Sequence, residues 1–184
     1  MPSSALSPLV AGLILMTALP AIHRADTEPE DQLRAAVVLS FLRYGEWPQP
    51  PAGNAPIHIG VLGRPSFVQI LRRTLEGKSV NDHPIRVQEL KTVADAAGFQ
   101  VVYFATDKSA EVRQELAATQ LTRTLTIGEA KDFLEWGGAV NLLVIDGHMS
   151  FEVNLDVLDR SGVVISSKLL RFGHIRKLKN GVRS

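Results

Sequence analysis

The sequence contains no cysteine among its 184 residues. Disulfides, thiol chemistry and cysteine-ligated metal sites are therefore excluded. An excess of charge is absent too, because 20 basic and 19 acidic side chains leave a formal net charge of +1. Such a balance provides no broad electrostatic field for nucleic acid or an anionic membrane, and we expect no nucleic-acid partner.

Motifs of several enzyme classes are also missing. There is no Gly-x-Ser-x-Gly elbow, and no two of the five histidines lie three or four residues apart. Gly77-Lys78-Ser79 repeats the end of a phosphate loop, but Arg72 stands where that loop needs glycine. Gly60-Val61-Leu62-Gly63 lacks the third glycine of a dinucleotide-binding turn. We therefore expect no metal site, no cofactor, no catalytic residue and no enzymatic activity.

A long hydrophobic run is limited to the start of the chain. Residues 9–19 carry no charge, and a helix of that length would span about 16 Å, too short for a ~30 Å hydrocarbon core. We therefore predict a signal peptide over residues 1–25, a periplasmic protein, and one domain over residues 26–184. The alternative is an uncleaved first helix, since neither Lys nor Arg precedes the run.

Hydrophobic periodicity predicts strands alternating with helices through the rest of the chain. Strands are expected at 57–62, 85–90, 99–105, 125–127, 140–145 and 149–155, and helices at 27–44, 67–75, 109–118 and 128–136. Alternating strands and helices favour a mostly parallel sheet with helices on both faces. The turn residues Asp146-Gly147 join the last two strands into an antiparallel hairpin. The predicted fold is a single-domain, three-layer α/β sandwich with a C-terminal antiparallel hairpin.

Two helices of this prediction carry further detail. In the first, Leu33, Val37, Phe41 and Tyr44 have helical spacing and are expected to form its apolar stripe. A short helix is expected to begin at Asn154 or Asp156 and to end at Gly162.

The C-terminal region favours binding rather than chemistry. Ser166 and Ser167 are typical N-cap residues, and they precede a basic, amphipathic segment that we expect to be the last helix. Polar side chains at strand ends are where α/β proteins usually bind ligands. The predicted partner-binding or ligand-binding residues are Glu152, Asn154, Ser166, Ser167, Lys168 and Arg171. The alternative is a docked terminal helix whose charged face is only solvated. Glu152 and Asp156 could serve acid–base catalysis, but a cap or an ion pair with Lys168 or Arg171 is the simpler account.

An ordered set of short segments resembles the YfiR family of periplasmic proteins. The matching segments are Leu33-Arg34-Ala35-Ala36, Trp47-Pro48, Ile59-Gly60-Val61-Leu62-Gly63, Val101-Val102-Tyr103-Phe104, Leu125-Thr126-Ile127, Gly137-Gly138, Phe151-Glu152-Val153-Asn154-Leu155 and Ile165-Ser166-Ser167-Lys168-Leu169-Leu170. The resemblance covers residues 30–178, and the last two segments are its most specific part.

The resemblance implies a compact α/β domain, often dimeric, that represses a membrane-bound diguanylate cyclase. The protein would bind the periplasmic domain of that inner-membrane cyclase, or of a sensor kinase, and keep cyclic-di-GMP low. An outer-membrane lipoprotein would compete by sequestering it. Two other functions stay open: a periplasmic small-ligand-binding or sensor protein, and, least favoured for want of an activated nucleophile, a hydrolase.

Overall fold

The computed structural model describes residues 28–106, 108–118, 121–145 and 147–176, and the predicted signal peptide lies outside them. Eight strands form one sheet in the order β10-β8-β7-β6-β5-β2-β4-β3. Their bounds are β2 (Ile57–Gly63), β3 (Ser79–Val80), β4 (His83–Glu89), β5 (Val101–Ala105), β6 (Leu125–Gly128), β7 (Val140–Ile145), β8 (His148–Asn154) and β10 (His174–Arg176). The five central strands β4, β2, β5, β6 and β7 pair in parallel.

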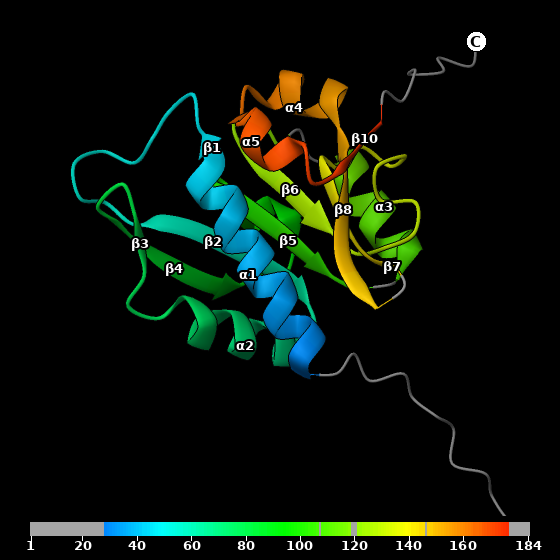
Figure 1. Cartoon of the computed structure of the whole chain (residues 1–184), viewed down its shortest axis with the longest axis horizontal. Coiled ribbons are helices and arrows are strands. Elements are labelled where there is room, and N and C mark those ends of the chain that lie inside the picture. Colours follow the sequence, from blue (N-terminus) through cyan, green and yellow to red (C-terminus); the bar gives the residue numbers. More distant parts are fainter. Residues whose placement is uncertain (1–27, 107, 119–120, 146, 177–184) are drawn as a thin grey trace, which may run out of the picture.

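Helices cover both faces of this sheet (Figure 1). The helices are α1 (Glu28–Tyr44), α2 (Pro65–Leu75), α3 (Ser109–Ala118), α4 (Leu155–Ser161) and α5 (Ser167–Leu170), with a 3-10 turn η1 (Val93–Ala96). The helix α1 lies diagonally across one face, between α2 and α5. The predicted α/β fold with a mostly parallel sheet is thus confirmed. The antiparallel hairpin is confirmed as well, because β7 and β8 pair from Ile145↔His148 to Val140↔Val153.

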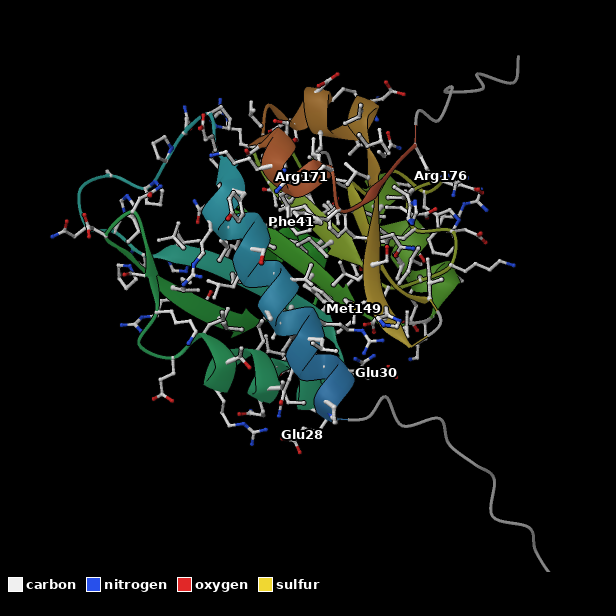
Figure 2. The ribbon with its side chains drawn as sticks, in the orientation of Figure 1. Glu28, Glu30, Phe41, Met149, Arg171 and Arg176 are labelled. Carbon is white, nitrogen blue, oxygen red and sulfur yellow. The ribbon has the colours of Figure 1, made fainter. Side chains whose placement is uncertain are left out.

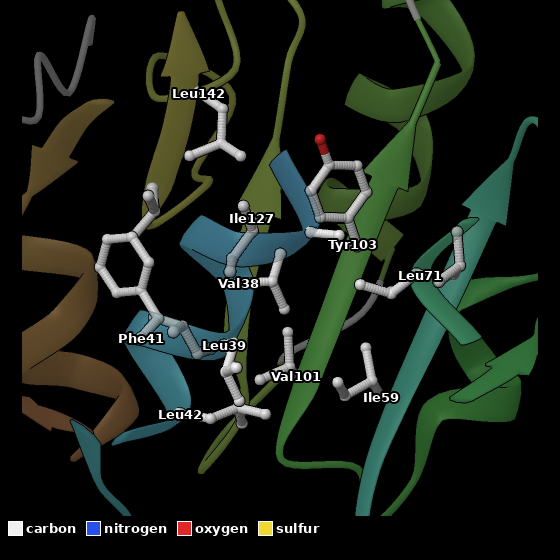
Figure 3. Close-up of a cluster of buried hydrophobic side chains, with 14 of the residues drawn as sticks. Val38, Leu39, Phe41, Leu42, Ile59, Leu71, Val101, Tyr103, Ile127 and Leu142 are labelled. Carbon is white, nitrogen blue, oxygen red and sulfur yellow. The ribbon is translucent and has the colours of Figure 1, made fainter. Parts of the chain in front are cut away.

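Alternation along the strands divides the apolar residues between two cores. On β5, Val101 and Tyr103 belong to the core under α1 and α2, whereas Val102 and Phe104 belong to the core under η1 and α3. Successive side chains of a strand point to opposite faces, so a strand buried on both faces reads as a continuous apolar run. Figure 3 shows α1 side chains, among them Val38 and Leu42, facing strand residues across the larger core.

The apolar stripe predicted for α1 is only partly correct. Phe41 is buried, but Leu33 and Tyr44 are 51% and 44% exposed. The helix instead buries the arc that contains Val38 and Leu42. Apolar residues occur on almost every side of this helix, so spacing alone could not show which arc meets the sheet.

The helix predicted over residues 128–136 is wrong. This segment forms consecutive turns, with bonds such as Phe133 N to Ala130 O at 3.1 Å and Gly137 N to Leu134 O at 3.2 Å. The Phe133 ring packs where a Cβ on Gly128 or Gly138 would be, at 2.5 and 2.1 Å. This close packing folds the segment back on itself and favours turns over a helix.

The basic C-terminal helix begins after Ser166, as predicted, but it is much shorter than the amphipathic segment suggested. Helix α5 has four residues, and the chain continues as β10, parallel to β8 in the main sheet. Gly173 allows the change of direction, because a Cβ there would meet the Phe151 ring at 2.0 Å. A short strand, β9 (Val164–Ile165), precedes Ser166 and pairs with β1 (Gly45–Glu46) outside the main sheet.

Candidate functional site

A cavity of about 760 Å³ opens at the carboxyl ends of β2, β4, β5 and β6. The connection after β2 leads to α2 in one layer, and the connection after β5 leads to α3 in the other. The chain therefore leaves these two neighbouring strands toward opposite faces. Open α/β sheets bind ligands at this kind of switch point, because the diverging connections leave a crevice there. We call this cavity the switch-point crevice.

Gly63 allows β2 to end at the wall of the crevice. Its φ of +107° belongs to the region that favours glycine, and an added Cβ would meet the carbonyl oxygen of Ala105 at 2.3 Å. The amide of the next residue, Arg64, donates to that same oxygen at 2.9 Å. The close approach of β2 and β5 thereby holds the Arg64 side chain at the edge of the crevice.

A buried charge cluster, formed by Asp31, Arg34, Arg64, Glu129 and Tyr103, lies beside the crevice. Arg34 contacts Asp31 at 3.1 Å and Glu129 at 3.2 Å. Arg64 pairs with Asp31 at 2.9 Å and also with Glu129. Two carboxylates thus each bridge two guanidinium groups, and this connects α1 to the ends of β2 and β6.

The local environment shifts two pKa values in the cluster. Burial raises the pKa of the Glu129 carboxyl, although Arg64 and Arg34 oppose that shift. Burial, and next the Glu129 charge, also raise the pKa of Tyr103. The phenol therefore stays protonated and donates to Glu129 at 3.1 Å. Figure 3 shows the Tyr103 ring within the core.

The residues predicted as a binding site take several roles. Glu152 lies on β8 and approaches Arg176 at 3.6 Å rather than Lys168 or Arg171. Asn154 is buried, and its side chain accepts from Val157 N and donates to Leu134 O, both at 3.3 Å. It caps α4, which Gly162 ends in a left-handed conformation, as the sequence predicted.

The other four predicted residues stay together at α5. Ser166 caps this helix by accepting from Lys168 N at 3.3 Å, while Ser167, Lys168 and Arg171 are exposed. The Arg171 guanidinium lies 4.8 Å from the centre of the Phe172 ring. The described cavities are lined by other residues, so the binding role of this set stays a prediction.

Neither the switch-point crevice nor its charge cluster was predicted from the sequence. Two patterns pointed to it: Arg64 and Glu129 each directly follow a glycine that ends a predicted buried strand. Placing Glu129 in a helix concealed the second pattern. Among the described residues, no group of three or more His, Asp or Glu could hold a metal ion.

The comparisons with known proteins support the fold and the family. A conserved domain protein from Vibrio cholerae O1 biovar El Tor strain N16961 is similar, with a TM-score of 0.55 and 14% identity over 80% of this chain and 60% of that one. The ABC domain from Streptococcus pneumoniae, solved with L-Trp, has a TM-score of 0.51 and 12% identity over 65% of this chain and 55% of that one. At such identities these likenesses show the fold alone, and the chain spans less than two thirds of either protein.

No curated protein matches the sequence. A family model does match, and its match covers residues 31–174, which include the whole sheet except the last residues of β10. The chain belongs to the YfiR/HmsC-like family.

Proposed function

We propose that this protein is an exported periplasmic regulator that inhibits a membrane-bound diguanylate cyclase by direct contact and so lowers cyclic-di-GMP. The observation that carries the proposal is the family match over residues 31–174. Membership of the YfiR/HmsC-like family indicates a periplasmic, regulatory protein of diguanylate cyclase signalling rather than a catalytic one. In the described ranges, no helix has the length and apolar character to cross a membrane.

The surface around α5 is the contact that we propose for the partner. Lys168 and Arg171 are exposed there, and the neighbouring Phe172 and Ile175 are 66% and 52% exposed. An arginine beside an exposed aromatic ring is typical of residues that dominate binding energy. Figure 2 shows Arg171, just after α5, near one end of α1, with Glu28 and Glu30 at the other end of α1.

Inhibition of this kind needs no chemistry from the regulator. A protein that binds one state of the cyclase more tightly than the other shifts the cyclase toward that state. Stable contacts bury about 800 Å² on each partner. We propose the periplasmic domain of an inner-membrane cyclase as the partner, with a sensor kinase as the alternative. An outer-membrane lipoprotein would relieve the inhibition by sequestration, and the regulator itself would be a homodimer.

Deletion of the gene tests the regulatory step. We expect cyclic-di-GMP, measured by mass spectrometry of cell extracts, to rise on deletion and to return to its original level on complementation. A K168E/R171E variant should accumulate normally in the periplasm yet fail to restore the low level, because charge reversal at a contact surface disfavours binding.

The matched control is R113E, which reverses an exposed arginine on α3, in the opposite layer. It should complement fully. An unchanged cyclic-di-GMP level in the deletion strain would rule out the regulatory function, whereas full complementation by K168E/R171E would rule out only the α5 surface. Capture of the cyclase's purified periplasmic domain by the wild type, and not by K168E/R171E, would identify direct contact.

A further inference from the structure

The switch-point crevice combines an apolar floor with a cationic rim. Leu62, Leu90, Phe104 and Val112 belong to the smaller core and also line the crevice. At the rim are the side chains of Arg64, Lys91 and Lys108. Small-molecule sites are mostly apolar concavities of roughly 300–1,000 Å³ with a few polar groups that fix orientation, and the crevice fits that description.

All three described carboxylates that line the crevice already have partners within the protein. Glu129 pairs with two arginines and accepts from Tyr103. Glu115 accepts from the Val93 amide at 2.9 Å, and Glu111 contacts Lys108 at 3.3 Å. Cations thus compensate the charges of Glu129 and Glu111, and a backbone hydrogen bond satisfies Glu115. Lys91, in contrast, makes no ion pair in the described part of the chain.

The rim guanidinium of Arg64 is also held in place before any ligand arrives. Its side chain is 30% exposed, while its partners Asp31 and Glu129 are 4% and 8% exposed. An arginine fixed by buried carboxylates loses little side-chain freedom on binding, and its planar group suits a carboxylate or a phosphate.

We propose that the switch-point crevice binds a small organic anion. The ligand's apolar body contacts Leu62, Leu90 and Phe104, and its carboxylate or phosphate is bound by Arg64, Lys91 and Lys108. This inference goes beyond the proposed function, because binding in the crevice requires no cyclase. It gives specific chemistry to the small-ligand alternative that the sequence left open.

In the test, the purified domain is titrated with benzoate and with phenyl phosphate. Calorimetry and the NMR shifts of the backbone amides measure the binding. Benzamide is the neutral analogue of benzoate, and inorganic phosphate lacks the apolar body. We expect at least one organic anion to bind about tenfold more tightly than benzamide, since charge-assisted hydrogen bonds are lost with the charge. The same anion should bind more tightly than inorganic phosphate and shift the amides of Gly63 and Thr106.

Variants of exposed lysines keep the fold intact and locate the site. The K91Q/K108Q variant should weaken anion binding about tenfold, because two of the three rim cations are removed. The control R73Q removes an exposed arginine outside the crevice, which pairs with Glu28, and should bind as the wild type does.

Three results would each overturn the proposal. They are that neither organic anion binds more tightly than benzamide, that the organic anion that binds is held no more tightly than inorganic phosphate, or that its binding is unchanged in K91Q/K108Q. A negative titration leaves the cyclic-di-GMP result of the deletion strain untouched, so the failures of the two proposals can be distinguished.

Discussion

At the scale of single residues, the buried charge cluster joins α1 to the ends of β2 and β6, in addition to the packing of α1 on the larger core. Asp31 and Glu129 have little access to water, so each depends on guanidinium groups for compensation. Buried charges that lose a partner are costly, whereas exposed pairs contribute little. The cluster and the exposed Arg73–Glu28 pair both involve α1, and they allow this difference to be measured within one protein.

The substitution R34M tests the buried pairs. It removes one of the two guanidinium groups that Asp31 and Glu129 each bridge, and we expect a loss of about 3 kcal/mol in the free energy of unfolding. The control R73M removes an exposed ion pair of 3.0 Å and should cost less than about 1 kcal/mol. Urea denaturation followed by circular dichroism gives both values. Equal losses would show that the cluster holds α1 no better than a surface pair does.

The raised pKa of Glu129 predicts a dependence of stability on pH. Because its folded-state pKa lies above its unfolded value, the folded protein binds this proton more readily than the unfolded chain does. The stability that protonated Glu129 adds to the folded protein is therefore fully present below the unfolded pKa. It is lost as pH rises through the folded-state pKa.

We expect the wild type to lose more stability than E129Q as pH rises from about 4.5 through that pKa, because glutamine does not titrate there. Unfolding curves in urea at stepped pH values give the comparison. Parallel pH profiles for the two proteins would contradict the assignment of the titration to Glu129.

Gly63 provides a test of packing at the crevice wall. The substitution G63A adds a Cβ at a positive φ and against the Ala105 carbonyl, and we expect a loss of about 2 kcal/mol or more. Gly77 has a positive φ of +67° as well, but nothing lies within 4 Å of an added Cβ. G77A should therefore cost only about 1 kcal/mol, and thermal unfolding of both variants separates the steric contribution from the backbone strain.

At the scale of elements, the sequence predicted a helix or strand correctly where a single nearby residue determines its boundary. The sequence predicted the strand β2 and the ends of α4, because a continuous apolar run, an N-cap asparagine and a C-terminal glycine act locally. It failed for residues 128–136 and for the C-terminal segment. The Phe133 ring packs against the glycines at the two ends of its own segment, whereas the Phe151 ring of β8 packs against the distant Gly173, and these contacts override local helix preference.

The N-cap residue Asn154 allows a test of what stabilises the helix α4. N154A removes the cap of α4 and also one of the two donors to the Leu134 carbonyl, which then accepts from Gly137 N alone, and we expect a loss of about 2 kcal/mol. S166A removes only the cap of the four-residue helix α5, near the surface, and should cost about 0.5 kcal/mol. Hydrogen exchange of the α4 amides should accelerate in N154A alone. Unaltered protection of α4 would contradict the capping role.

At the scale of the whole molecule, the family points to a periplasmic, regulatory protein. The chain lacks cysteine and a charge excess, and its family is one of regulatory, periplasmic proteins. Removing residues 1–25 would remove one arginine, leaving 19 basic and 19 acidic side chains. We propose that the exported domain is neutral and therefore depends on local surfaces, not on a global field, to find its partner.

Export is tested by the N-terminus of the protein from cell fractions. We expect the mature chain in the periplasmic extract, with intact-mass analysis showing cleavage near residue 25. A variant with Leu13→Arg and Leu15→Arg should remain uncleaved in the cytoplasm, since charge disrupts the apolar run. An uncleaved wild-type chain in the cytoplasmic fraction would contradict both the signal peptide and the periplasmic role.

The sequence by itself determined the α/β class, most strands and the family, because apolar periodicity and capping residues act over a few neighbours. It did not determine which arc of α1 meets the sheet, nor that α5 gives way to a strand. Only the tertiary structure brought Asp31, Arg34, Arg64 and Glu129 together and opened a crevice beside them. The reason is that side chains at the ends of β2 and β6 become neighbours only when parallel strands align in one sheet. The separation of these residues along the chain does not predict which strands will align.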